Sequence, residues 1–135
     1  MDAKIIDNFE KQGAILLKGV FKEWVNKIIS GIERNLVKPS KYANENNVKE
    51  GRFFDDYCNW TRIKEFKDFI QNSEAAKIAA EIMKSTTAQF FHDHVLVKEG
   101  GTSTETPWHQ DAPYYFVNGS KTVSMWIPVD QIIDT

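Results

Sequence analysis

A histidine and an aspartate that could bind a metal stand two residues apart, at His109 and Asp111 in the motif WHQD. In extended backbone, residues two apart project to the same side, so an imidazole nitrogen and a carboxylate oxygen would face one point in space. These groups belong to the 2-His-1-carboxylate site, which holds Fe(II) and keeps coordination positions open for other molecules. A surface histidine beside a turn aspartate gives the same short pattern, so the pair needs supporting context.

Two strand-like segments flank the pair, and in both of them the apolar residues stand mainly at odd-numbered positions. Residues 89–98 and 121–129 are rich in β-branched and aromatic side chains, as strands are. Since alternate side chains of a strand face opposite sides, each segment has an apolar face for helices to cover and a mixed face that would line a cavity. Asp93 interrupts the apolar odd positions, which are Phe91, Val95, Val97, Val123, Met125, Ile127 and Val129.

A turn is predicted between the two segments at Asn118-Gly119. This dipeptide is typical of a type I′ hairpin, because that turn needs positive φ at both central residues. It would fold residues 114–117 back against the second strand.

The first 86 residues are interpreted mainly as helical support for these strands. Apolar residues at helical spacing predict helices over 21–36 and 63–70, and Ser73 would cap another over 74–85. A short helix before Gly13 and a strand over 14–19 precede them. The aromatic residues between 53 and 60 are interpreted as packing under a polar loop, with the alternative that some line a substrate pocket.

Composition argues against several classes of partner. The 135 residues suffice for one domain with its own core, and a net charge of −2 without a basic stripe argues against nucleic acid. No apolar run approaches the length of a membrane span, and the N-terminus lacks the apolar stretch of a signal peptide. The single cysteine, Cys58, fits a reducing compartment. We therefore expect a cytoplasmic protein with neither nucleic acid nor membrane as partner.

A strand ending in VKEGG, the motif PWHQD and the strand VSMWIPV follow one another in this chain. In this order they resemble the phytanoyl-CoA dioxygenase family of non-haem Fe(II)/2-oxoglutarate oxygenases, and the opening FEKQGAILLKGVF is similar to that family's N-terminal helix, strand and second helix. The resemblance implies an α+β fold, with N-terminal helices packed on part of a double-stranded β-helix of the jelly-roll or cupin type. Residues 1–135 would be a single domain, with helical support in 1–86 and the β-core in 87–135.

The resemblance also implies roles for the matching residues. Fe(II) would be bound by His109 and Asp111, with 2-oxoglutarate and O2 at the open positions, and a small organic substrate would be hydroxylated. His94 is instead interpreted as structural. The residues implied for the 2-oxoglutarate pocket are His92, Leu96, Lys98, Ser124 and Trp126, where Lys98 either pairs with a carboxylate or snorkels at the strand end. Those considered for the substrate pocket are Tyr114, Tyr115, Phe54 and Trp60.

Members of the family also carry a second histidine ligand, and an arginine for 2-oxoglutarate, downstream of the positions matched here. We therefore expect the N-terminal portion of an oxygenase, inactive alone, that self-associates through the open edge of its last strand, residues 121–129. Two other functions stay open. One is a non-catalytic metal- or ligand-binding half-barrel, and the other is a cupin-type protein in which His92 or His94 joins His109 and Asp111 at a metal.

Overall fold

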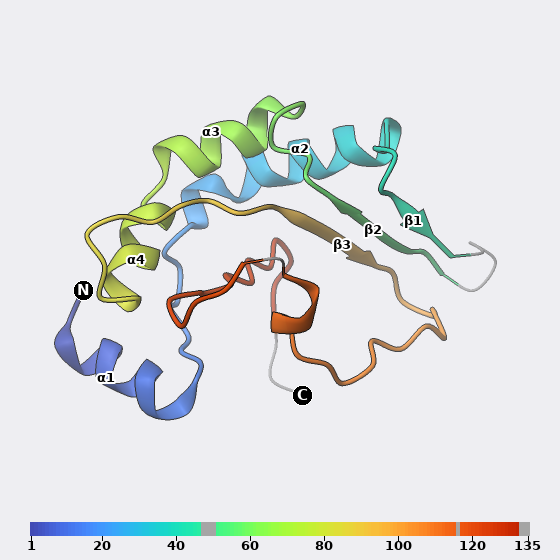
Figure 1. Ribbon diagram of the computed structural model, residues 1–135. Coiled ribbons are helices and arrows are strands. Elements are labelled where there is room, and N and C mark those ends of the chain that lie inside the picture. Colours follow the sequence, from blue (N-terminus) through green and yellow to red (C-terminus); the bar gives the residue numbers. More distant parts are fainter. Residues whose placement is uncertain (47–50, 116, 133–135) are drawn as a thin grey trace.

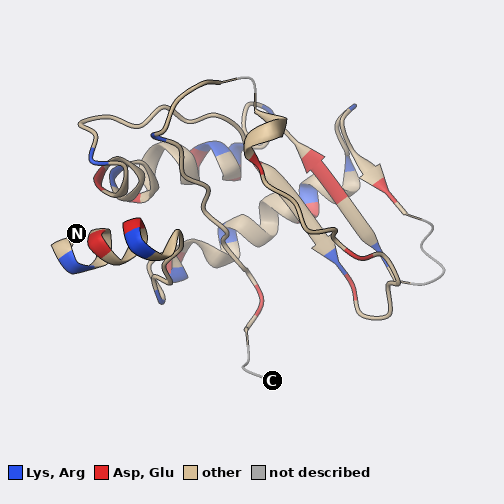
Figure 2. Cartoon of the chain, turned by 60° about the horizontal axis from the view of Figure 1, so that its bottom comes forward, with Lys and Arg blue, Asp and Glu red and all other residues tan. Residues whose placement is uncertain are grey.

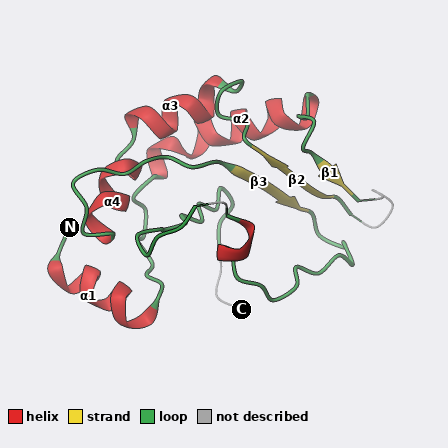
Figure 3. Cartoon of the chain, viewed as in Figure 1, coloured by secondary structure: helices red, strands yellow, loops and turns green. Residues whose placement is uncertain are grey.

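The computed structural model describes residues 1–46, 51–115 and 117–132. Helices α2 and α3 lie along one side of a small sheet, and the segment that follows the sheet lies on its other side (Figures 1 and 3). The mixture of helices and an antiparallel sheet confirms the α+β class. The elements in chain order are α1 (Ala3–Gln12), η1 (Lys22–Trp24), α2 (Val25–Val37), β1 (Asn44–Glu45), β2 (Phe53–Tyr57), α3 (Lys64–Asn72), α4 (Ala75–Ile82), β3 (His94–Lys98) and η3 (Ala112–Tyr114).

Strand β2 is the centre of the sheet, whose order is β1-β2-β3 with antiparallel neighbours. Phe54 pairs with Val97 and Asp56 with Val95, so these four side chains share one face. This strand corrects the interpretation of residues 53–60 as an aromatic cluster under a loop. The two adjacent aspartates hide the strand in the sequence, because charged residues interrupt its apolar alternation.

The core lies between that face of the sheet and helices α2 and α3. Its buried centre consists of Phe54, Ile63, Phe66 and Val95. Apolar residues of α2 at helical spacing pack against this centre, as the sequence predicts: Ile28, Ile32 and Leu36. The two helices approach closely at Gly31, where a Cβ would lie 2.7 Å from Phe66 Cδ1.

A buried carboxylate joins α2 to β2. Asp56 is 0% exposed, and its oxygens accept hydrogen bonds from Asn35 Nδ2 (2.7 Å), from the backbone N–H of Ser40 (2.8 Å) and from the Ser40 hydroxyl. Arg62 Nη2 lies 3.4 Å from Oδ2. Burial raises the pKa of Asp56, but the hydrogen bonds from Ser40 and Asn35 outweigh it and lower the pKa to about 2.

Asp93 also has a structural role, which explains its place among apolar odd positions. Its carboxylate accepts the backbone N–H groups of Asn59 (3.0 Å) and Trp60 (2.9 Å), and its carbonyl accepts that of Cys58 (3.0 Å). These bonds give partners to the backbone N–H groups of the turn that connects β2 to α3.

Three of the predicted strand segments differ from the structure. Residues 14–19 form irregular backbone and turns, residues 89–93 precede β3 outside the ladder, and residues 121–129 pair with no described strand. A strand needs a neighbour for its backbone hydrogen bonds, so apolar alternation alone does not form one. The described residues therefore contain a three-stranded sheet, and the double-stranded β-helix core is not seen among them.

The predicted parity of residues 121–129 nevertheless agrees with their burial. The odd positions Val123, Met125, Ile127 and Val129 are half-buried, whereas the even positions are exposed. The chain reverses before this segment without the type I′ turn: Gly119 has a φ of 155°, but Asn118 is not among the described residues with positive φ.

Acidic and basic residues are interspersed over the helices and strands (Figure 2). No helix among the described residues is long and apolar enough to cross a membrane.

Candidate functional site

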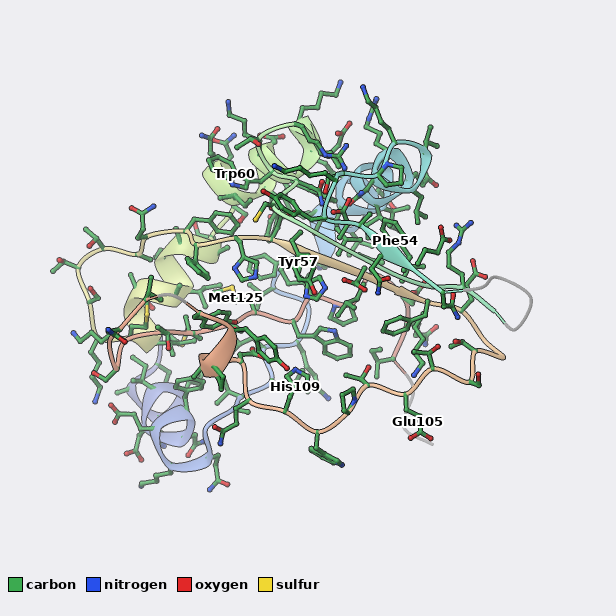
Figure 4. The ribbon with its side chains drawn as sticks, turned by 45° about the vertical axis from the view of Figure 1, so that its right-hand side comes forward. Phe54, Tyr57, Trp60, Glu105, His109 and Met125 are labelled. Atoms are coloured by element: carbon green, nitrogen blue, oxygen red, sulfur yellow. The ribbon has the colours of Figure 1, made fainter. Side chains whose placement is uncertain are left out.

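The segment between β3 and η3, which carries His109 and Asp111, lies on the side of the sheet opposite α2 and α3 (Figure 1), and Figure 4 labels His109 within it. His109 Nε2 is 3.4 Å from Asp111 Oδ1, so the two side chains face each other. His109 Nδ1 lies 2.7 Å from the carbonyl oxygen of Pro107. Because a carbonyl oxygen only accepts, Nδ1 carries the hydrogen, and in the neutral ring Nε2 keeps its lone pair.

Short-range backbone structure places Asp111. It is the N-cap of η3, with Pro113 in the first turn, and its carbonyl accepts the backbone N–H of Tyr114 at 2.9 Å. The Tyr114 ring lies 6.1 Å from the His109 ring, edge-on at 80°. The imidazole, the carboxylate and this aromatic ring are therefore held together within six residues of chain.

The second oxygen of Asp111 contacts residues from further along the chain. Its Oδ2 lies 3.3 Å from the Tyr115 hydroxyl and 3.4 Å from the Ser124 hydroxyl, and these two hydroxyls are 3.2 Å apart. The Tyr115 ring packs edge-on against Phe91 at 5.2 Å and His92 at 5.8 Å. The structure thus brings together four residues that the sequence assigns to separate pockets or strands: Asp111, Tyr115, Ser124 and His92.

The open face of the sheet adds a group that the sequence interpretation missed. Tyr57 stacks on His94 across the strands, with ring centres 4.1 Å apart, and His94 Nε2 lies 3.7 Å from Asp55 Oδ1. Burial, and then the Asp55 carboxylate, raise the pKa of Tyr57. Burial lowers the pKa of His94, and this effect outweighs the Asp55 carboxylate, which raises it. The alternation of FFDDY carries the signal that places Tyr57 and Asp55 on this face.

The remaining residues of the predicted cosubstrate pocket are on exposed surfaces. Leu96 is 52% exposed on the open face of β3, and Trp126 is 78% exposed. Lys98 Nζ lies 5.8 Å from the centre of the Phe53 ring, so its stem covers an aromatic neighbour at the strand end.

Two residues considered for the substrate pocket belong to the core side instead. Phe54 is 1% exposed. It pairs with Val97 on the face of the sheet that the helices cover. Trp60 packs against the core and edge-on against Phe90, with ring centres 5.7 Å apart. Figure 4 shows Phe54, Trp60 and His109 on different parts of the fold, with Tyr57 between them.

No three His, Cys, Asp or Glu side chains within residues 1–46, 51–115 and 117–132 lie close enough to hold a metal ion together. Neither His92 nor His94 therefore joins His109 and Asp111 in this arrangement, as a cupin-type site would require. The metal-binding candidates that face each other within the described residues are therefore a pair, His109 and Asp111.

Comparison with known proteins defines the class to which this chain belongs. The model of the family described as phytanoyl-CoA dioxygenase matches residues 9–134, and the chain therefore belongs to this family of oxygenases. No curated protein and no solved structure is significantly similar to the chain. The match begins within α1 and covers α2, α3, α4, the sheet and the His109–Asp111 segment.

Proposed function

We propose that this chain supplies the iron-binding and cosubstrate-binding part of a non-haem Fe(II)/2-oxoglutarate-dependent dioxygenase that hydroxylates a small organic substrate. Membership of the phytanoyl-CoA dioxygenase family supports the reaction class. The observation that carries the proposal is the arrangement of His109 Nε2 and Asp111 Oδ1, which lie 3.4 Å apart.

The chemistry of these donor atoms fits Fe(II). Imidazole nitrogen with carboxylate oxygen is the donor combination of the 2-His-1-carboxylate site. The contact from His109 Nδ1 to the Pro107 carbonyl has the form of the outer hydrogen bond that orients a metal-binding histidine and fixes its tautomer. A further ligand would come from a group other than the His, Cys, Asp and Glu side chains described beside this pair.

Bound iron would supply the oxidising chemistry, in which 2-oxoglutarate is decarboxylated to succinate while O2 is consumed. The protein residues would bind and orient the organic molecules. His92, Lys98 and Ser124 offer polar groups for the carboxylates of 2-oxoglutarate, and Leu96 and Trp126 would shield it from water. Tyr114, whose ring lies beside that of His109, would contact the substrate. The cytoplasmic location expected from the sequence stays a prediction.

Titration with Mn(II), a redox-inert substitute for Fe(II), tests the metal site. Wild type should bind the metal, and His109→Ala and Asp111→Ala should each weaken binding by more than about 100-fold, because each removes a direct ligand rather than an outer one. His94→Ala is the matched histidine control and should keep wild-type affinity. Equal affinity of wild type and His109→Ala would refute the proposal, and so would loss of binding in His94→Ala alone.

A further inference from the structure

We infer that Tyr115 and Ser124 are positioning residues that hold the Asp111 carboxylate in the orientation needed for metal binding. This inference rests on the function proposed above. It gives both hydroxyls a role in addition to the contacts with substrate or 2-oxoglutarate that are expected from the sequence.

The two oxygens of Asp111 have different partners. Oδ2 faces the hydroxyls of Tyr115 and Ser124, at 3.3 Å and 3.4 Å, whereas Oδ1 faces His109 Nε2 at 3.4 Å. An ionised carboxylate only accepts hydrogen bonds, so a hydroxyl near Oδ2 donates to it. Donation to Oδ2 opposes rotation of the carboxylate and directs Oδ1 toward the histidine, where a cation would be shared.

The Tyr115 hydroxyl is itself held in place from two directions. Its ring packs edge-on against Phe91 and His92, at 5.2 Å and 5.8 Å, in the segment that leads into β3. Its backbone N–H donates to the Ala112 carbonyl at 3.1 Å, which ties it to η3. A packed aromatic ring gives its hydroxyl a defined position at small entropic cost, because few torsions must be fixed.

Ser124 links the same carboxylate to a distant part of the chain. It is one of the exposed even-numbered positions of residues 121–129, and its Oγ is 3.2 Å from the Tyr115 hydroxyl. Asp111 Oδ2 and the two hydroxyls thus form a triangle of polar contacts joining η3 to residues 121–129. Hydrogen bonds of this kind to a metal-binding carboxylate typically change metal affinity by about 10- to 100-fold.

The test compares Mn(II) affinity in single variants that remove or retain a hydroxyl. Tyr115→Phe and Ser124→Ala should each weaken binding by about 10-fold, the lower end for such partners because both contacts are long. Ser124→Thr keeps a hydroxyl and should restore most of the affinity. Tyr42→Phe and Ser120→Ala are matched controls elsewhere on the surface and should bind as wild type does. Melting temperatures of the metal-free variants should stay at the wild-type value.

The outcomes separate this inference from the proposed function. If wild type binds Mn(II) through His109 and Asp111 but Tyr115→Phe and Ser124→Ala bind equally well, the positioning role is overturned and the metal site stands. Weakened binding in Ser124→Thr equal to that in Ser124→Ala, or a lowered melting temperature of metal-free Tyr115→Phe, would also overturn it, since either points to a packing role. If wild type binds no Mn(II), the proposed function fails, and the inference fails with it.

Discussion

At the scale of single residues, neighbouring groups decide which atom of a side chain is free to react. The Pro107 carbonyl accepts a hydrogen bond from His109 Nδ1, and this leaves Nε2 directed at Asp111. Asp56 shows the opposite arrangement, because donors on Asn35 and Ser40 surround its buried carboxylate. We therefore propose a binding role for Asp111 and a stabilising role for Asp56.

The stability contributed by Asp56 should depend on pH. Its folded pKa is lowered from 3.8 to about 2. A carboxyl group whose pKa is lower in the folded than in the unfolded protein stabilises the fold at pH values above its unfolded-state pKa. This stabilisation is lost as the pH falls through the folded-state pKa. The ionised carboxylate therefore contributes about 2 kcal/mol near neutral pH, which should disappear as the pH falls from about 4 to about 2. Urea unfolding at several pH values measures this.

The variant Asp56→Ala should be about 3 kcal/mol less stable than wild type near neutral pH, since it leaves several buried donors unpaired. Its stability should also fall less steeply in acid. The control Asp7→Asn alters an exposed aspartate paired with Lys11 and should change stability by less than about 0.5 kcal/mol. If Asp56→Ala and wild type lose stability in parallel below pH 4, the explanation for Asp56 is wrong.

The sequence identifies His109 and Asp111 because their spacing acts over two residues of backbone. It does not reveal that Tyr115 and Ser124 meet at Asp111 Oδ2, because that contact depends on how a chain reversal without a type I′ turn brings two segments together. Asp55 and Tyr57 escape detection for a related reason. Their face of β2 becomes visible only once the pairing with β3 is known.

At the scale of elements, the alternation of apolar and polar residues predicts which side chains are buried more reliably than it predicts which segments pair as strands. The odd and even positions of β3 and of residues 121–129 differ in burial as the sequence indicates. Yet residues 121–129 and 14–19 pair with no described strand. Burial depends on one apolar surface nearby, whereas a ladder needs a partner strand in register, which local sequence does not specify.

Adjacent residues of β3 test the two faces. Val95 is buried between sheet and helices, so Val95→Ala should cost about 2 kcal/mol through lost packing. Leu96 is on the open face, and Leu96→Ala should cost less than about 0.5 kcal/mol. Thermal and urea unfolding of the two variants measure the difference, and a larger loss for Leu96→Ala would reverse the assignment of faces.

At the scale of the whole molecule, helices cover one face of the sheet, while one edge of β3 pairs with no strand in the described part of the chain. At the two ends of β3, the N–H of Cys58 donates to the carbonyl of Asp93 and the N–H of Glu99 donates to the carbonyl of Arg52, so the backbone groups of odd-numbered residues point toward β2. The backbone groups of His94, Leu96 and Lys98 therefore face the other edge, where no described strand pairs. Such an edge is a template for another chain.

The sequence places self-association at residues 121–129, but these pair with no described strand and so form no sheet edge. We predict self-association through the edge of β3 instead, most simply as a two-fold dimer in which β3 pairs with its copy. Sedimentation at tens of micromolar should give an average mass above that of the monomer (about the range where such edges associate). Leu96→Pro removes an outward N–H without touching the β2 ladder and should shift the protein toward monomer. The control Leu96→Ala should associate as wild type does. A monomer throughout, or equal association of Leu96→Pro, would contradict the prediction.

The central claim is that His109 and Asp111 create a metal-dependent site for 2-oxoglutarate. Calorimetric titration of 2-oxoglutarate into wild type, with and without Mn(II), tests it most directly, with Asp111→Ala as the variant lacking a ligand. We predict binding to wild type only when Mn(II) is present, and none to Asp111→Ala under either condition. Binding of 2-oxoglutarate to metal-free wild type as tight as to the Mn(II) form, or undiminished binding to Asp111→Ala with Mn(II), would contradict the claim.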